Sequence, residues 1–246
     1  LGGAPGEIRA PEAPRHPQSL SRAHGTLGAM NVNVSPIITA LSCDWAPASS
    51  PSGKLLVVLH GRGDSSQGFH WMPEALAFRE LNYLLVNAPD DYYGGKSWYA
   101  LPPDHAPGVL RSRDLLDRLF EELLGQGYEP AEIGLLGFSQ GCLMTLEWGA
   151  RSALALGAYV GISGYCLDAR TLLAERSPSC MAESWLITHG RHDETLDYET
   201  TRQQIAELKR GGFALRFETY DKGHTIDPED ELPVLRSFLA ERLGVR

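Results

Sequence analysis

The sequence predicts an α/β fold built on a mostly parallel central sheet with helices on its faces. From Ser35 onward, short apolar runs alternate with segments of helical periodicity, as they do in strand-helix-strand units. Strands are expected near residues 35–42, 55–59, 83–87, 132–137, 155–160, 185–189 and 214–220. The second observation is a serine between glycines, Ser139, which directly follows one of these strands.

The clearest helical pattern covers residues 109–124 and ends at Gly125. Its apolar stripe consists of Leu115, Leu116, Leu119, Phe120, Leu123 and Leu124. A helix with such a wide apolar face is expected to pack against the sheet. The last helix is predicted to begin with Asp227 as its N-cap and Pro228 at its first helical position.

Residues 1–29 differ in composition from the remainder of the chain. They hold four prolines among glycine, alanine and scattered arginine, without helical or strand periodicity. We expect a disordered extension, left from an expression vector or encoded upstream of a start at Met30; a basic interaction arm is the alternative. No internal repeat or linker divides residues 30–246, which therefore predict one domain.

Composition narrows the class of function. The chain has 246 residues, 43% of them hydrophobic, and a formal net charge of -9 without a basic block, so nucleic acid is not an expected partner. Its longest aliphatic run, residues 55–59, is strand-sized, and no stable membrane insertion is expected. The four cysteines lack zinc-ligand spacing, and residues 1–29 lack the apolar core of a secretory signal. These features favour reduced thiols, a cytoplasmic location and no metal.

Residues 133–141 carry the most informative motif. An apolar strand runs into Gly-x-Ser-x-Gly, and a helical pattern follows over residues 143–148. This context is typical of a nucleophile elbow, where Gly137 and Gly141 are needed because side chains there would collide across the turn. Ser139 is therefore the candidate nucleophile.

A serine hydroxyl attacks a carbonyl only when a neutral imidazole takes its proton and a carboxylate orients that imidazole. In such sheets the acid and then the histidine come from loops after later strands. The loop after residues 185–189 supplies Asp193, and the loop after residues 214–220 supplies His224. The alternatives are Asp197 as the acid, and His189 or His192 as the base. His224 is favoured as the base because the other two histidines belong to the same loop as the acid.

The strand at residues 55–59 ends in a glycine-containing loop, residues 60–64. Acyl transfer places negative charge on the carbonyl oxygen, and unobstructed backbone N–H groups stabilise that charge. We assign this oxyanion hole to the N–H groups of Arg62 and Gln140. Alternatively, Gly61 and Gly63 serve only the turn. His60 is expected to brace the loop rather than to react.

The aromatic residues of two loops predict the walls of a substrate pocket. Residues 90–99 follow a strand and combine glycines with aromatic side chains, as loops lining a pocket often do. The predicted lining residues are Phe69, Trp71, Tyr93, Trp98 and Tyr99. The alternative is that Trp98 and Tyr99 simply pack on the domain.

Taken together, residues 60–64, 137–141, 189–193 and 223–224 resemble the phospholipase/carboxylesterase family of the α/β-hydrolase fold, which includes bacterial carboxylesterases and acyl-protein thioesterases. The resemblance covers roughly residues 35–242. It implies a compact hydrolase with a minimal cap, no cofactor, and Ser139, Asp193 and His224 as its triad. The chain departs from the family pattern at Cys142, where glycine or alanine is common, at Arg62, where a hydrophobic residue is frequent, and after Asp193, where a proline is often found.

The leading functional expectation is a serine carboxylesterase that hydrolyses small soluble esters through an acyl-enzyme. A lysophospholipase or an acyl-protein thioesterase is the near alternative, and a non-catalytic binding module on the same fold is disfavoured by the complete triad. A dienelactone-hydrolase type of enzyme is disfavoured because the elbow carries Ser139 and not cysteine. The oligomeric state is left open, and a homodimer is compatible with the sequence.

Overall fold

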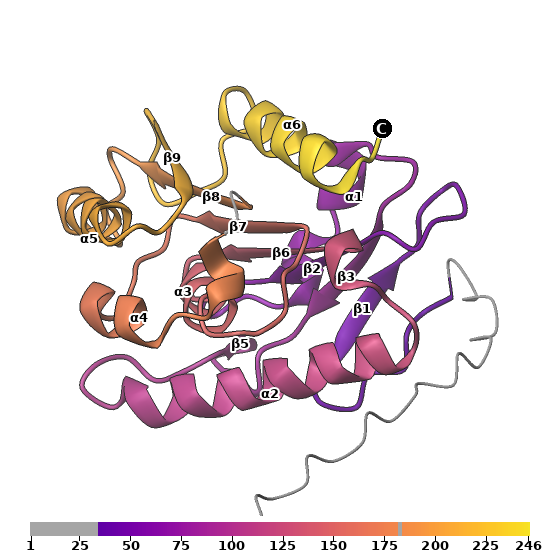
Figure 1. The fold of residues 1–246 in the computed structure, drawn as a ribbon, viewed down its shortest axis with the longest axis horizontal. Coiled ribbons are helices and arrows are strands. Elements are labelled where there is room, and N and C mark those ends of the chain that lie inside the picture. Colours follow the sequence, from indigo (N-terminus) through magenta and orange to yellow (C-terminus); the bar gives the residue numbers. More distant parts are fainter. Residues whose placement is uncertain (1–33, 182–183) are drawn as a thin grey trace, which may run out of the picture.

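The computed structural model describes residues 34–181 and 184–246, which form a seven-stranded sheet with helices on both faces (Figure 1). The strand order is β1-β3-β2-β6-β7-β8-β9; β1 pairs antiparallel with β3, and the other neighbours are parallel. This confirms the predicted mostly parallel sheet. The strands are β1 (Cys43–Ala46), β2 (Leu55–Leu59), β3 (Asn82–Val86), β6 (Ile133–Phe138), β7 (Ala158–Ile162), β8 (Trp185–Gly190) and β9 (Leu215–Tyr220).

The helices divide between the two faces, with α1 and α6 on one and α2 to α5 on the other (Figure 1). Their bounds are α1 (Met72–Leu76), α2 (His105–Gly125), α3 (Gln140–Gly149), α4 (Ala169–Glu175), α5 (Tyr198–Arg210) and α6 (Glu231–Leu243). Short 3-10 turns lie at η1 (Ser66–Phe69), η2 (Pro130–Glu132) and η3 (Pro178–Met181). Central strands are buried on both faces, which explains their continuous apolar runs.

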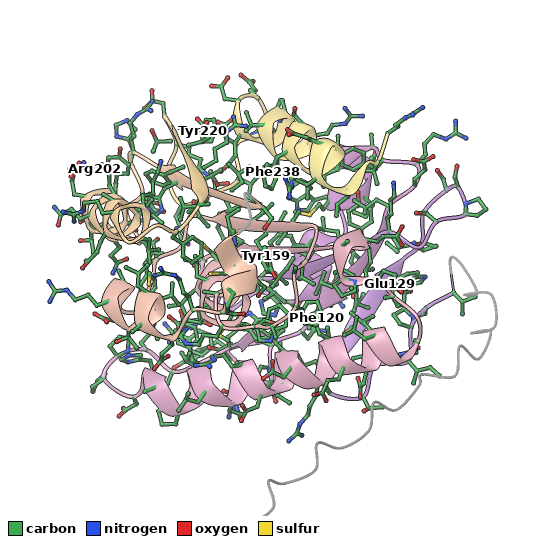
Figure 2. The ribbon with its side chains drawn as sticks, in the orientation of Figure 1. Phe120, Glu129, Tyr159, Arg202, Tyr220 and Phe238 are labelled. Atoms are coloured by element: carbon green, nitrogen blue, oxygen red, sulfur yellow. The ribbon has the colours of Figure 1, made fainter. Side chains whose placement is uncertain are left out.

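Each face of the sheet has its own apolar core. Phe120 of α2 stacks on Trp148 of α3 with ring centroids 4.1 Å apart, and Tyr159 of β7 stacks on Trp185 of β8 at the same distance. Phe238 of α6 belongs to the opposite core (Figure 2). The predicted stripe of the long helix is thus directed toward the sheet, as its periodicity indicates.

The prediction of a strand at residues 35–42 is wrong, because the first strand among the described residues is β1. Side chains at the end of α2 and directly after it bind the backbone of residues 37–39 instead: the N–H of Ile37 donates to Gln126, and the N–H of Thr39 donates to Glu122. With its donors taken by a helix, this segment does not need a strand partner.

The final helix also differs from its prediction, because α6 begins at Glu231 rather than at Pro228. Asp227 still accepts hydrogen bonds from the backbone N–H groups of Glu229 and Asp230, but it does so in a turn that precedes the helix. A short hairpin, β4 (Asp90–Tyr92) with β5 (Gly95–Ser97), was not predicted.

Two predictions lie partly or wholly beyond the described residues. The extension at residues 1–29 is outside them, and the division of the chain into that extension and one domain stays a prediction. None of the helices within residues 34–181 and 184–246 is long and apolar enough to cross a membrane.

Candidate active site

Ser139 lies at the tight turn between β6 and α3, and its backbone has φ 54° and ψ −114°. A positive φ at a residue other than glycine is strained and is maintained only by the surrounding structure. The two flanking positions have room only for glycine. A Cβ on Gly137 would lie 2.1 Å from the carbonyl oxygen of Gly141, and a Cβ on Gly141 would lie 2.1 Å from the carbonyl oxygen of Leu59. The motif therefore specifies a backbone shape that presents the hydroxyl beyond the sheet edge.

The structure brings the three sequence-predicted residues Ser139, His224 and Asp193 together. They follow β6, β9 and β8, and the carboxyl ends of these parallel strands share one edge of the sheet. His224 Nε2 lies 2.9 Å from Ser139 Oγ, and His224 Nδ1 lies 2.7 Å from Asp193 Oδ2. A single imidazole thus connects the hydroxyl to the carboxylate.

Asp193 is held ionised and fixed in place. Its side chain is 0% exposed, and its second oxygen, Oδ1, accepts the backbone N–H groups of Thr195 and Leu196 at 2.9 and 2.8 Å. Burial acts to raise the pKa of Asp193, but the hydrogen bonds from His224 and from these two N–H groups outweigh it and lower the pKa. An ionised Asp193 must receive the Nδ1 proton of His224, which leaves Nε2 free to accept the proton of Ser139.

The competing residues have other contacts. Asp197 caps α5, because its Oδ2 accepts the N–H of Thr200 at 2.8 Å. His192 is mostly exposed and is paired with Asp221. His189 is buried beneath the acid loop, with Nε2 3.1 Å from the carbonyl oxygen of Leu196, and burial lowers its pKa. His189 therefore packs under the loop that carries Asp193.

The loop after β2 lies directly against the nucleophile: a Cβ on Gly61 would lie 3.2 Å from the Cβ of Ser139. His60 braces this loop. Its Nε2 accepts the N–H of Ala88 at 3.0 Å, so its proton is on Nδ1 and is donated to the carbonyl oxygen of Gly61 at 2.6 Å. Burial lowers the pKa of His60, although the Gly61 contact opposes this, which favours the same neutral ring. In a planar trans peptide the N–H points in the direction opposite to the C=O. Fixing the Gly61 carbonyl therefore also fixes the direction of the Arg62 N–H.

The backbone and the side chain of Gln140 have separate roles. Its backbone N–H is the first of α3, and the first N–H groups of a helix have no acceptor within the helix. Its buried side chain accepts from the N–H of Trp98 at 3.0 Å and donates to the carbonyl oxygen of Tyr99 at 2.9 Å. For the part of the chain that the structure describes, no acceptor is recorded for the N–H of Arg62 or of Gln140. Both predicted oxyanion donors are thus unpaired next to Ser139.

The family model described as phospholipase/carboxylesterase matches residues 46–243. The chain belongs to the phospholipase/carboxylesterase family. The acyl-protein thioesterase 1 of Emericella nidulans is 27% identical, covering 78% of this chain and 92% of the relative, and that of Candida albicans is 29% identical, covering 78% and 94%. Among solved structures, esterase PE8 has a TM-score of 0.71 at 29% identity and covers 82% of this chain and 99% of its own. The chain is therefore an α/β-hydrolase enzyme of the serine hydrolase type.

Two of the predicted pocket residues line a cavity that His224 also borders. Phe69 and Trp71 border a space of about 470 Å³ together with Phe138, His224 and Leu232. The cavity is largely apolar in its walls, and His224 forms part of it. A substrate group placed there lies next to the imidazole.

The pocket assignments of Trp98 and Tyr93 are wrong. Trp98 is 0% exposed because its Nε1 donates to the carbonyl oxygen of His60 at 2.9 Å and its ring joins the core beneath α2. Tyr93 points to solvent with 95% exposure, at the tip of the β4–β5 hairpin. Tyr99 is also buried, although it borders a second, smaller cavity. Packing on the domain thus describes Trp98, as the alternative expectation stated.

The departure from the family pattern at Cys142 has a structural counterpart in β7 and in the segment directly after it. A Cβ on Gly161 would lie 2.6 Å from the Cys142 sulfur, and a Cβ on Gly164 would lie 2.4 Å from it. These two glycines make room for the larger side chain. Burial raises the pKa of the Cys142 thiol to about 12, so it does not compete with Ser139 as a thiolate.

Sequence reasoning missed Lys222 and Glu231, which form a buried ion pair behind His224. Lys222 Nζ donates to Glu231 Oε2 at 2.5 Å and to the carbonyl oxygen of Thr225 at 2.6 Å, and the two side chains are 2% and 0% exposed. Burial lowers the pKa of Lys222, although the carboxylate opposes this. The pair fixes the loop of His224 to the start of α6. Its residues offer no sequence signal, because lysine and glutamate near a turn are normally solvated.

Replacing Lys222 with methionine should destabilise the protein by about 3–5 kcal/mol, because it leaves the Glu231 carboxylate buried without its partner. Denaturant unfolding measures this loss. The double variant Lys222→Met/Glu231→Gln removes both charges and should recover much of it. Equal stability of Lys222→Met and the unmodified protein would contradict the structural role of the pair.

In the residues that the structure covers, no group of three or more histidine, cysteine or acidic side chains is arranged to hold a metal ion.

Proposed function

We propose that the protein hydrolyses small soluble carboxylic esters through an acyl-enzyme on Ser139. The observation that carries the proposal is the hydrogen-bonded chain from Ser139 Oγ through His224 to Asp193. The membership of the chain in a family of esterases supports the reaction class.

In the first step, Ser139 Oγ attacks the ester carbonyl carbon while His224 Nε2 takes the hydroxyl proton. Asp193 stabilises the resulting imidazolium without accepting its proton. The unpaired N–H groups of Arg62 and Gln140 are proposed to stabilise the negative carbonyl oxygen, an interaction of the kind that preorganised donors supply without reorganisation cost.

Collapse of the tetrahedral intermediate releases the alcohol, and His224 returns the proton to the leaving oxygen. The leaving group must therefore lie on the side of His224, which is the side of the cavity lined by Phe69 and Trp71. Water then enters, His224 removes its proton, and hydrolysis of the acyl-enzyme frees Ser139.

A second candidate is a thioesterase or lysophospholipase acting on long acyl chains. The specific observation in its favour is that the similar proteins of Emericella nidulans and Candida albicans are named acyl-protein thioesterases. The same triad chemistry serves a thioester, so the two candidates differ in the length and attachment of the acyl group rather than in mechanism.

A panel of 4-nitrophenyl esters from acetate to palmitate separates these candidates. We expect kcat/KM to be highest for acyl chains of a few carbons and to fall for longer ones. The cavity of about 470 Å³ is open to solvent and lies on the leaving-group side, so it does not enclose a long acyl chain. Steady-state rates at one pH and ionic strength provide the measurement. A maximum at palmitate, together with release of thiol from a palmitoyl thioester, would favour the thioesterase instead.

A further inference from the structure

A second cavity, of about 250 Å³, borders the loop after β2, residues 60–64, on the α2 side of the sheet. It is lined by Arg62, Asp90, Asp91, Tyr92, Ser97, Tyr99, Ala100 and Leu101. Figure 1 shows β5 on the side of α2, whereas α1 and α6, which flank the larger cavity, lie on the opposite side of the sheet. Ser97 Oγ donates to the Gln140 side chain at 3.1 Å, which connects this cavity to the residue after the nucleophile.

The Arg62 side chain is held at this cavity as an unpaired cation. Its guanidinium carbon lies 4.0 Å from the centroid of the Tyr92 ring, a cation–π contact that fixes the side chain without neutralising it. Its Nε is buried without a hydrogen-bond acceptor in the described part of the chain. A buried donor without an acceptor is costly, which makes Arg62 a group that gains from an anionic ligand.

The acids around the cavity do not supply that anion, because each has another partner. Asp90 binds Arg111 at 2.5 Å, and Asp91, which is mostly exposed, binds Lys96 at 2.7 Å. Asp64, two residues along the loop, accepts the N–H of Ser65 and borders the other cavity. The charge of Arg62 therefore remains available, although the chain as a whole carries a net charge of -9.

We propose that Arg62 and the cavity beside it bind a carboxylate at the end of a short acyl group, so that the preferred substrates are monoesters of small dicarboxylic acids. The inference rests on the proposed function, which places the leaving group on the side of His224. The acyl group is then proposed to extend to the opposite side, toward Arg62. The volume is below the range typical of pockets for larger ligands, so it suits a short chain.

The test compares two substrates that differ only at the far end of the acyl chain: monoethyl glutarate, which ends in a carboxylate, and ethyl valerate, which ends in a methyl group. Both release ethanol, so one assay measures both. We expect kcat/KM of the wild-type protein to be about tenfold higher for the glutarate, equivalent to ~1.4 kcal/mol, through a lower KM that rises with added salt. Equal values, or a preference for the valerate, would overturn the proposal.

The variant Arg62→Met removes the charge but retains the backbone N–H, and it should reverse the preference, so that the ratio of glutarate to valerate falls below one. Arg62→Lys should keep a preference above one, although a smaller one, because lysine keeps the charge without the planar fork. The matched control is Arg236→Met: Arg236 also lies over an aromatic ring, that of Phe78, but on α6. A lost preference in Arg236→Met, or an intact one in Arg62→Met, would overturn the assignment.

The variant Tyr92→Leu is a second route to the same answer if Arg62→Met does not fold. It leaves the charge but removes the ring that holds it, and it should lower the ratio by raising KM for the glutarate alone. The two proposals fail differently. Absence of hydrolysis of both esters by the wild-type protein would refute the esterase function, whereas hydrolysis without charge preference would refute only the role of Arg62.

Discussion

Replacing Ser139 with alanine should remove nearly all turnover, with a loss in kcat of about 10⁶, since the members of a triad act as a unit. The Ser139 hydroxyl lies 2.9 Å from His224 Nε2, and alanine removes this group but keeps the Cβ. The strained backbone and the flanking glycines are unchanged, so the fold should survive.

Single-turnover and steady-state rates on 4-nitrophenyl acetate measure this loss, and a fluorophosphonate probe should label the unmodified protein and not the variant. The matched control is Ser163→Ala, because Ser163 is a buried serine that also has a positive φ but follows β7. If Ser139→Ala retained turnover within tenfold of the unmodified protein, the nucleophile would have to be sought elsewhere.

The second large effect concerns the acid. Asp193→Asn should reduce kcat by about 10⁴ at neutral pH because it forces the wrong tautomer on His224. Three donors converge on this one carboxylate: Oδ1 accepts two backbone N–H groups, and Oδ2 accepts the His224 Nδ1 proton. The oxygen of asparagine must stay with the two fixed N–H groups, so its NH₂ faces His224. The imidazole then presents a bare Nδ1, carries its proton on Nε2, and cannot accept that of Ser139.

Asp197→Asn is the matched control, since it makes the same chemical change four residues away. Asp197 caps α5, and asparagine caps a helix about as well as aspartate does, so both turnover and melting temperature should change little. kcat and thermal unfolding of the two variants give the comparison. A loss of turnover in Asp197→Asn combined with an active Asp193→Asn would reverse the assignment of the acid, while leaving those of Ser139 and His224 intact.

The motifs predicted most of the site because each follows a strand of recognisable pattern. Ser139, Asp193 and His224 come after the apolar runs of β6, β8 and β9, and parallel strands bring their carboxyl ends to one edge. The pocket was predicted less well. Residue type could not distinguish Trp98, which the Gln140 side chain and the His60 carbonyl fix within the core, from a tryptophan that lines a cleft.

The Lys222–Glu231 pair and the unpaired guanidinium of Arg62 could not be predicted either. A lysine and a glutamate separated by nine positions are ordinary surface residues until burial of both removes their water. Among the described residues Arg62 likewise has no acidic partner, while the nearby Asp90 and Asp91 are bound by Arg111 of α2 and Lys96 of the hairpin.

The sequence by itself therefore determined the parallel strands that carry the site, the elbow at Ser139 and the loops that carry the acid and the base. These depend on local periodicity and on glycines, such as Gly137 and Gly141, at positions where a Cβ would collide with neighbouring backbone. Only the tertiary structure decided which aromatic residues face the cavity beside His224 and which charge stays unpaired at the loop after β2. The physical reason is that exposure, and the partner of a buried charge, depend on which segments distant in the chain pack against it.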